Sequence, residues 1–183
     1  MSENKTEVIV SEGVQAFELA QRKAKMYSLS TLVPVTYQGE GNVANVMIAC
    51  NMAQRMQCDP LQVMQSLHVI HGRPSFSAAF LIARWNTDGR WTAINYEFND
   101  ERTACKAWAK SRETGERVEG TQITMEMAKA EGWLDKKGSK WQTMPEQMLR
   151  YRAATFLIRS HAPELMLGMY ERTEVEDVYG EQS

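Results

Sequence analysis

The sequence predicts an α+β fold in which helices pack with one small antiparallel sheet. Apolar residues recur at helical spacing in the first and last thirds of the 183-residue chain, whereas the middle third alternates apolar and polar residues as strands do. No linker, repeat or low-complexity segment divides the chain. We therefore expect a single domain over residues 13–170, preceded by a flexible N-terminus, 1–12, and followed by an acidic C-terminal tail, 171–183.

Three helices are expected near the N-terminus. Residues 14–29 have the apolar spacing of an amphipathic helix. Asn42 is a residue type that caps helices, and it precedes a second helix over 43–56 whose apolar side chains form one stripe. Asp59 stands directly before a proline, a combination that starts a new helix, so a short third helix should cover 60–66.

The middle of the chain should supply the sheet. Strands are expected within four segments, namely 67–76 (a strand and a turn), 91–98, 101–111 and 118–125. A turn at Gly115 separates the last two of them. Ser77 is placed to cap a helix over 78–86 that interrupts the strands.

The last third returns to helical spacing. It should contain a helix at 125–132, a loop at 136–140 and a long helix at 145–160. Proline at position 163 cannot continue that helix, so the chain should turn there and close the core with the segment PELMLGMY.

The net charge of −2 hides a strong asymmetry. Residues 101–160 carry 12 basic and 8 acidic side chains, whereas residues 161–183 carry 1 and 6. A basic segment followed by an acidic one is common in nucleic-acid-binding proteins, where the acidic part can compete with the ligand or keep copies of the protein soluble. A solvated acidic terminus with no such role is the alternative.

The cysteine pattern and the N-terminus indicate the compartment. Cys50, Cys58 and Cys105 form no C-x-x-C pair and are odd in number, as expected in a reducing environment. The N-terminus has no apolar signal segment, and 18 consecutive apolar residues occur nowhere. We expect a soluble, cytoplasmic protein that does not enter a membrane.

Two cations flank an aromatic residue in the segment 101–111. Lys106, Trp108 and Lys110 share one face if this segment is a strand, because side chains alternate with period two. Bases can stack on such a tryptophan while the lysines neutralise phosphates. The alternative is an ordinary solvated strand face on which Trp108 folds against a neighbour.

A second basic cluster lies in the loop before the last long helix. Three lysines, Lys136, Lys137 and Lys140, surround Gly138 and Ser139. The glycine lets the backbone approach a phosphate, and the serine offers a donor. The Walker pattern is absent, so the loop predicts contact with a polyanion and gives no support to nucleotide hydrolysis.

The helix expected at 145–160 is apolar nearly all round, which predicts burial by more than one neighbour. Arg152 and Arg159 lie seven residues apart and therefore on one face. Arginines on a buried helix need an anionic partner. That partner is either phosphate or the chain's own carboxylates, with Glu146, Glu164 and the acids of 171–177 as candidates.

No arrangement of residues predicts bond chemistry. His68 and His71 would point to opposite faces of a strand, which disfavours a shared metal. Glu97, Asp100 and Glu101 cluster near a strand end, as a metal-dependent nuclease would require, but in no recognisable arrangement. We expect no catalytic residue and no metal ligand.

Several ordered blocks of this sequence resemble the RecT family of phage single-strand DNA annealing recombinases. The resemblance runs from about Pro34 to Val178, most of the chain. Its blocks are Asp59-Pro60, His71-Gly72-Arg73-Pro74, the helix Ser77–Asn86, Lys140-Trp141, Pro145 with Met148-Leu149, Arg152-Ala153, Arg159, Ala162-Pro163-Glu164, and Gly168-Met169-Tyr170 before Glu174 and Asp177.

The resemblance implies ATP-independent annealing of complementary DNA strands by a homo-oligomeric ring or filament, with DNA in a basic groove that crosses subunits. It also implies the strand–helix core of annealing proteins and the cytoplasm of a bacterial host cell. The DNA-binding candidates are Lys106, Lys110, Lys137, Lys140, Arg150, Arg152 and Arg159, with Arg73 and Arg84 as weaker ones. The stacking candidates are Trp108 and Trp141.

The resemblance also bears on cofactors and partners. It implies single-stranded DNA and the annealed duplex as ligands, and it requires no cofactor, while a role for Mg²⁺ stays open. Many family members have longer C-terminal regions, which are linked to a partner exonuclease or to host single-strand binding protein. This chain ends soon after the core, so those two partnerships also stay open. A metal-dependent nuclease and an oligomeric scaffold that binds no DNA are the alternative functions.

Overall fold

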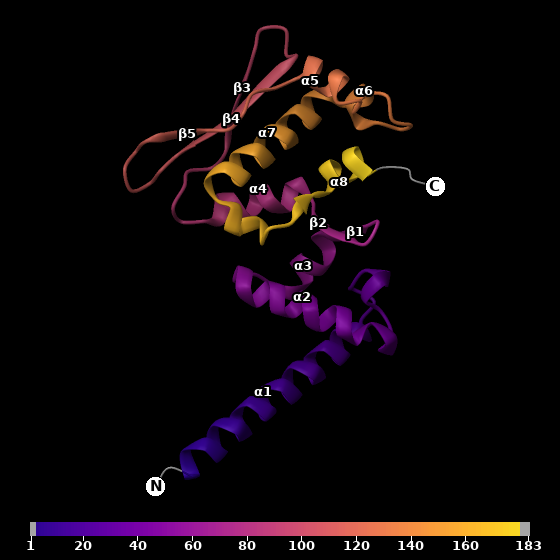
Figure 1. Cartoon of the computed structure of the whole chain (residues 1–183), viewed down its shortest axis with the longest axis vertical. Coiled ribbons are helices and arrows are strands. Elements are labelled where there is room, and N and C mark those ends of the chain that lie inside the picture. The colour runs from indigo at the N-terminus through magenta and orange to yellow at the C-terminus, as the bar shows by residue number, and fades with distance from the viewer. Residues whose placement is uncertain (1–2, 180–183) are drawn as a thin grey trace. The chain divides into compact units, whose positions relative to one another are not determined.

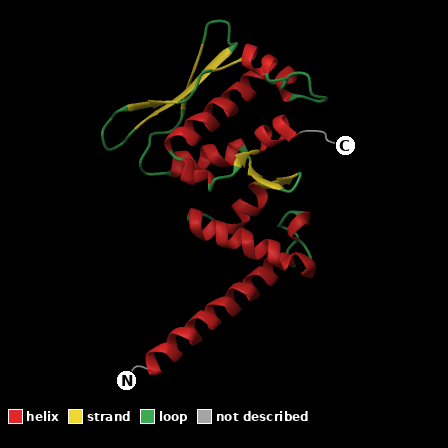
Figure 2. Ribbon diagram, in the orientation of Figure 1, coloured by secondary structure: helices red, strands yellow, loops and turns green. Residues whose placement is uncertain are grey.

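The computed structural model describes residues 3–179, with side chains for residues 13–178. It confirms the α+β class: the chain forms helices, a mixed three-stranded sheet and a small antiparallel four-stranded sheet (Figure 2). Contacts group the chain into two compact units, 1–66 and 67–183. The boundary falls where a helix passes directly into a strand, without the proline- or glycine-rich linker that would mark it in the sequence. The expected single domain over 13–170 stays a prediction.

The first unit is helical (Figure 1). It contains α1 (Glu3–Ser28), the short 3-10 helices η1 (Val35–Tyr37) and η2 (Glu40–Asn42), α2 (Val43–Met56) and α3 (Pro60–Ser66). The bounds predicted for α2 and α3 are confirmed. Helix α1 begins well before the predicted residue 14, so most of the segment expected to be flexible is assigned to a helix.

Asp59 starts α3 as predicted, because its Oδ1 accepts a hydrogen bond from Leu61 N at 2.7 Å. The prediction that Asn42 caps α2 is wrong. Its side chain caps nothing at that end and instead donates to the carbonyl of Gln38 at 2.7 Å.

The second unit begins with a hairpin of β1 (Leu67–Ile70) and β2 (Arg73–Phe76), to which β7 (Tyr170–Glu171) adds in parallel. The turn consists of His71 and Gly72, both with positive φ, which is the conformation that two-residue hairpin turns require. Helix α4 (Ala78–Thr87) follows, capped by Ser77, whose hydroxyl accepts from Phe80 N.

The four-stranded sheet has the order β3-β4-β5, with β6 also paired to β4. Its strands are β3 (Asn95–Phe98), β4 (Ala104–Lys110), β5 (Arg117–Glu119) and β6 (Ile123–Thr124). Two predicted strands were too long: 91–94 contributes only one bridge, and 118–125 is split into β5 and β6. Strand β4 alternates as predicted, since Cys105, Ala107 and Ala109 are fully buried on one face.

The chain then forms α5 (Met125–Ala130), α6 (Lys140–Thr143), α7 (Pro145–His161), η3 (Pro163–Met166) and α8 (Arg172–Tyr179). Helix α7 begins at a proline, where the missing N–H costs nothing. Figure 1 shows α7 lying across the four-stranded sheet, with α4 on its other side. None of the described helices is both long enough and apolar enough to span a bilayer.

Candidate nucleic-acid interface

Helix α7 is the centre of the second unit. It packs on β4 on one side and on α4 on the other, so the predicted burial by more than one neighbour is confirmed. Its buried residues are Met148, Leu149, Arg152, Ala153, Ala154, Thr155, Leu157 and Ile158. Helix α7 lies very close to Gly120, the residue that follows β5, because a Cβ added there would be 2.8 Å from the backbone nitrogen of Leu157. A larger residue at position 120 would push α7 off the sheet.

Arg152 is buried inside this packing and is only 3% exposed. Its guanidinium lies 4.2 Å from the ring centre of Trp133, forms a hydrogen-bonded ion pair with Asp177, and lies 3.7 Å from Glu174. A phosphate outside the protein cannot reach it. Burial argues against DNA contact by Arg152, which stays a prediction, and the alternative of pairing with the acids of 171–177 is the observed arrangement.

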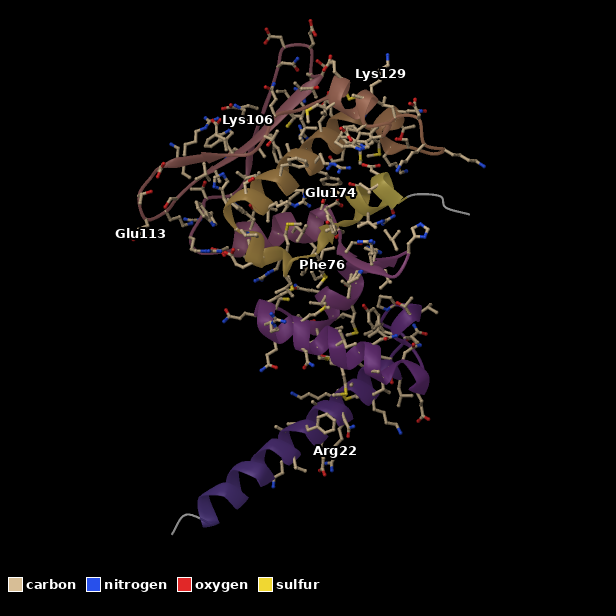
Figure 3. All side chains as sticks on the ribbon, in the orientation of Figure 1. Arg22, Phe76, Lys106, Glu113, Lys129 and Glu174 are labelled. Carbon is tan, nitrogen blue, oxygen red and sulfur yellow. The ribbon has the colours of Figure 1, made fainter. Side chains whose placement is uncertain are left out.

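Arg159 pairs with the same acidic segment. Its guanidinium donates to Glu174, which is itself buried, although Arg159 keeps a partly exposed side chain. Figure 3 labels Glu174, the carboxylate that both arginines share. Because its charge is already matched, Arg159 has little attraction left for phosphate.

Part of the acidic C-terminal segment is therefore packed against the protein instead of being solvated. Glu171 and Glu174 are almost fully buried, and α8 holds Asp177 against Arg152. Burial raises the pKa of the Glu171 carboxyl, which accepts from the backbone N of Thr173 at 3.0 Å. Burial likewise raises the pKa of Asp177. Residues 180–183 of the predicted tail lie outside the described part.

The lysine loop borders a surface cavity of about 630 Å³. Lys137 and Lys140 are exposed and form no ion pair with any described side chain. Lys136 has a different role, because its Nζ donates to the carbonyls of Glu176 and Asp177 at the end of α8. The cavity is also lined by Asp135, Glu176 and Asp177, so its charge is mixed.

Two expectations at this loop are corrected. Trp141 is only 1% exposed and lies against Trp133, with ring centres 5.1 Å apart, so it cannot stack on a base. The hydroxyl of Ser139 is occupied, since it donates to the carbonyl of Trp133 at 2.6 Å and accepts from Trp141 N. Ser139 and Trp141 therefore hold α6 in place. Gly138 does adopt the positive φ, 74°, that favours glycine.

The outer face of the four-stranded sheet carries Lys106, Trp108 and Lys110, as the alternation predicts. Trp108 is half-buried, and the guanidinium of Arg117 lies 4.2 Å from its ring centre, which covers one face of the ring. The predicted alternative, with Trp108 folded against a neighbour, describes this arrangement better than a free stacking platform does.

Ion pairs neutralise part of this face. Lys106 pairs with Glu119 at 3.0 Å, and Arg117 pairs with Glu97 at 2.8 Å and with Glu119 at 2.7 Å. The two cations lower the pKa of the Glu119 carboxyl. Lys110 is exposed, lies opposite Arg117 across the β4–β5 ladder, and has no ion pair among the described side chains.

A second surface cavity, of about 660 Å³, opens beside β3. Phe98 is one of the residues that line it, and the guanidiniums of Arg102 and Arg150 lie 4.5 Å and 5.3 Å from the centre of its ring. Arg102 is held by Glu146 through two hydrogen bonds, of 2.7 and 2.6 Å. Arg150, from α7, forms no ion pair with a described side chain.

Tyr96 also lines this cavity, and burial raises the pKa of its phenol to about 12. The phenol is therefore protonated at neutral pH and can donate a hydrogen bond. The Phe98 ring is already engaged by two guanidiniums, as Trp108 is by one, so this cavity is suited to a phosphate, which Arg150 and the Tyr96 phenol can contact, rather than to a stacked base.

The two weaker DNA-binding candidates, Arg73 and Arg84, belong to other elements than the four-stranded sheet and α7. Arg73 is exposed at the start of β2, opposite Ile70 in the hairpin. Arg84 is half-buried in the last turn of α4.

Nothing among the described residues forms a group of three or more histidine, cysteine or acidic side chains that could hold a metal. Glu97 is engaged by Arg117 on the outer face of the sheet, whereas Asp100 lines the Phe98 cavity. Cys105 is fully buried, and burial raises the pKa of its thiol to about 11, which keeps it in the unreactive thiol form.

Comparisons with protein-family models, with curated proteins and with solved structures find no match to this chain.

Proposed function

We propose that this protein binds single-stranded DNA and anneals complementary strands without ATP, as a homo-oligomer. The observation that supports the proposal is a set of cations that form no ion pair with the described acidic side chains. Within the basic segment 101–160, four of the candidate cations are at least partly accessible and form no ion pair with a described side chain: Lys110, Lys137, Lys140 and Arg150.

Each of two surfaces that carry these cations includes a residue of α7. The helix contributes Arg150 to the Phe98 cavity and Met148 to the cavity of the lysine loop. A strand bound at the first of these cavities would meet an arginine, and one bound at the second would meet a lysine pair. Contacts of this kind go to phosphate and sugar, which leaves base edges free to pair and gives little sequence preference.

The proposed mechanism needs no bond chemistry. Two strands repel each other through their phosphates, and they must also find their register. Cations that neutralise the phosphates of one strand reduce the repulsion, and neighbouring copies that hold the strand extended reduce the entropy lost on pairing. With roughly four phosphates neutralised per protomer, the logarithm of the binding constant should fall with the logarithm of salt concentration with a slope of about −3.

Two complementary oligonucleotides, one carrying a fluorescence donor and the other an acceptor, test the proposal. The protein should speed duplex formation without nucleotide and leave strand lengths unchanged when Mg²⁺ or Mn²⁺ is added. Shortened strands would instead support the metal-dependent nuclease. An unchanged annealing rate, together with oligomers that ignore DNA, would support a scaffold.

A further inference from the structure

The C-terminal end of α8 is fixed beside the lysine loop, residues 136–140. Lys136 Nζ donates to the backbone carbonyls of Glu176, at 2.6 Å, and of Asp177. The last carbonyls of a helix lack partners within the helix and lie at the negative end of its dipole, so they favour a lysine. The carboxylate of Asp177 is bound to Arg152 of α7 as well. These contacts hold the last turn of α8 in one place.

The three acidic side chains of α8 differ in their exposure. Those of Glu174 and Asp177 are only 6% and 9% exposed, and both pair with arginines of α7. The side chain of Glu176 is 42% exposed and lines the same cavity as the lysine loop. Glu176 is therefore the acid of α8 that a ligand in this cavity would meet.

Glu176 also occupies a cation of the cavity. Its carboxylate lies 2.7 Å from the guanidinium nitrogen Nε of Arg172, one helical turn earlier, and Arg172 lines the cavity too. A phosphate that approached Lys137 and Lys140 would be repelled by Glu176 and would find Arg172 already paired. Exposed pairs of this kind contribute little to stability, so the pair can be removed without unfolding the protein.

We propose that α8 is an internal competitor of phosphate at the lysine loop. Glu176 keeps Arg172 from the ligand and lowers the affinity of Lys137 and Lys140 for phosphate. This inference rests on the proposed function, since it takes the phosphates of a DNA strand as the ligand, and it adds a limit on affinity that is built into the fold. Such a limit speeds the release of bound strands.

Glu176→Gln tests the competition, with salt-titrated anisotropy of a single-stranded oligonucleotide as the measurement. The variant frees Arg172, so it should bind roughly two- to fivefold more tightly than wild type. Its salt slope should be steeper by about 0.7, the contribution of one further phosphate contact. Combining Glu176→Gln with Arg172→Gln removes both charges, and it should return the affinity and the slope to the wild-type values.

Glu18→Gln is the matched control. Glu18 and Arg22 form another exposed pair four residues apart on a helix, at 3.8 Å, and neither residue lines either cavity. This variant changes the net charge as Glu176→Gln does, yet it should bind DNA as the wild type does. An equal gain in the two variants would assign the effect to net charge and overturn the proposal.

A ligand other than DNA separates this inference from the proposed function. In isothermal titration calorimetry, Glu176→Gln should bind sodium tripolyphosphate more tightly than wild type does. That result in a protein that ignores oligonucleotides would support the competition and contradict the proposed function. The competition is overturned if Glu176→Gln, shown to be folded by circular dichroism, binds DNA and tripolyphosphate no more tightly than wild type, whether or not the wild type anneals strands.

Discussion

Arg152 of α7 is bound to Asp177 of α8 by a buried, hydrogen-bonded ion pair. The pair joins the last two α-helices of the described chain and removes the most buried arginine of the basic segment from any contact with solvent. Pairing of this kind distinguishes two groups of cations that look alike in the sequence. One group holds the fold together, and the other stays available to a ligand.

Arg152→Ala should destabilise the fold by about 3–5 kcal/mol, because it leaves Asp177 buried without its partner. Urea unfolding measures this change. At a temperature where the variant is folded, its single-strand binding should show the wild-type salt slope, measured by fluorescence anisotropy. A flatter slope with unchanged stability would mean that Arg152 contacts phosphate after all.

Lys137→Ala combined with Lys140→Ala should weaken binding to single-stranded DNA and reduce the steepness of the salt slope by about 1.4, since each phosphate contact contributes about 0.7. The melting temperature should stay unchanged, because neither side chain forms an ion pair with a described residue. Lys129→Ala is the matched control: Lys129 is also exposed but lies on α5, outside both cavities, and its replacement should have no effect on the slope. An unaltered slope in the double variant would remove the lysine loop from the DNA path.

Arg150→Gln should lower the affinity for single-stranded DNA and reduce the steepness of the slope by about 0.7, because Arg150 is the unpaired cation of the Phe98 cavity. Arg102 in the same cavity is held by Glu146 and should contribute less. Anisotropy titrations of Arg150→Gln and Arg102→Gln side by side make the comparison. The idea fails if Arg102→Gln has the larger effect on the slope.

How far the sequence could predict this molecule depends on the range of the interactions involved. Helices α2 and α3 and the alternation of β4 follow from local spacing, and they are confirmed. The pairing of the arginines could be stated only as an alternative, since it depends on residues 15 to 25 positions further along the chain.

Three features were not predicted, each for a different reason. Helix α8 was hidden because its sequence is dominated by acids, and only the buried Val175 signals an inner face. Trp141 was expected to be free because α6, the short helix that carries it into the core, is too brief to show a helical period. The Phe98 cavity was also missed, although the period of β3 places Tyr96 and Phe98 on one face. Arg102, distant in sequence from Arg150, offered no local signal.

Glu171→Gln should change how stability depends on pH. Burial raises the pKa of Glu171 in the folded protein above its value in the unfolded chain, so the folded state binds the proton more tightly. The free energy of unfolding of the wild type therefore loses a contribution as pH rises from the unfolded pKa, about 4.3, through the folded pKa. The glutamine variant lacks this loss.

Urea unfolding of both proteins at pH 4 and pH 7 tests this expectation. The stability of Glu171→Gln relative to wild type should rise between the two pH values. The contribution of Asp177, whose pKa burial also raises, cancels in the comparison to first order. A difference that stays constant, or that falls with pH, would contradict the assignment of Glu171 as a carboxylate destabilised by burial.

The most direct test of the central claim is the salt dependence of single-strand binding by a variant in which Lys110, Lys137, Lys140 and Arg150 are all replaced by alanine. The wild type should show a slope of about −3, and the folded quadruple variant a slope near zero. Equal slopes for the two proteins, or a wild type that does not bind oligonucleotide at low ionic strength, would contradict the account.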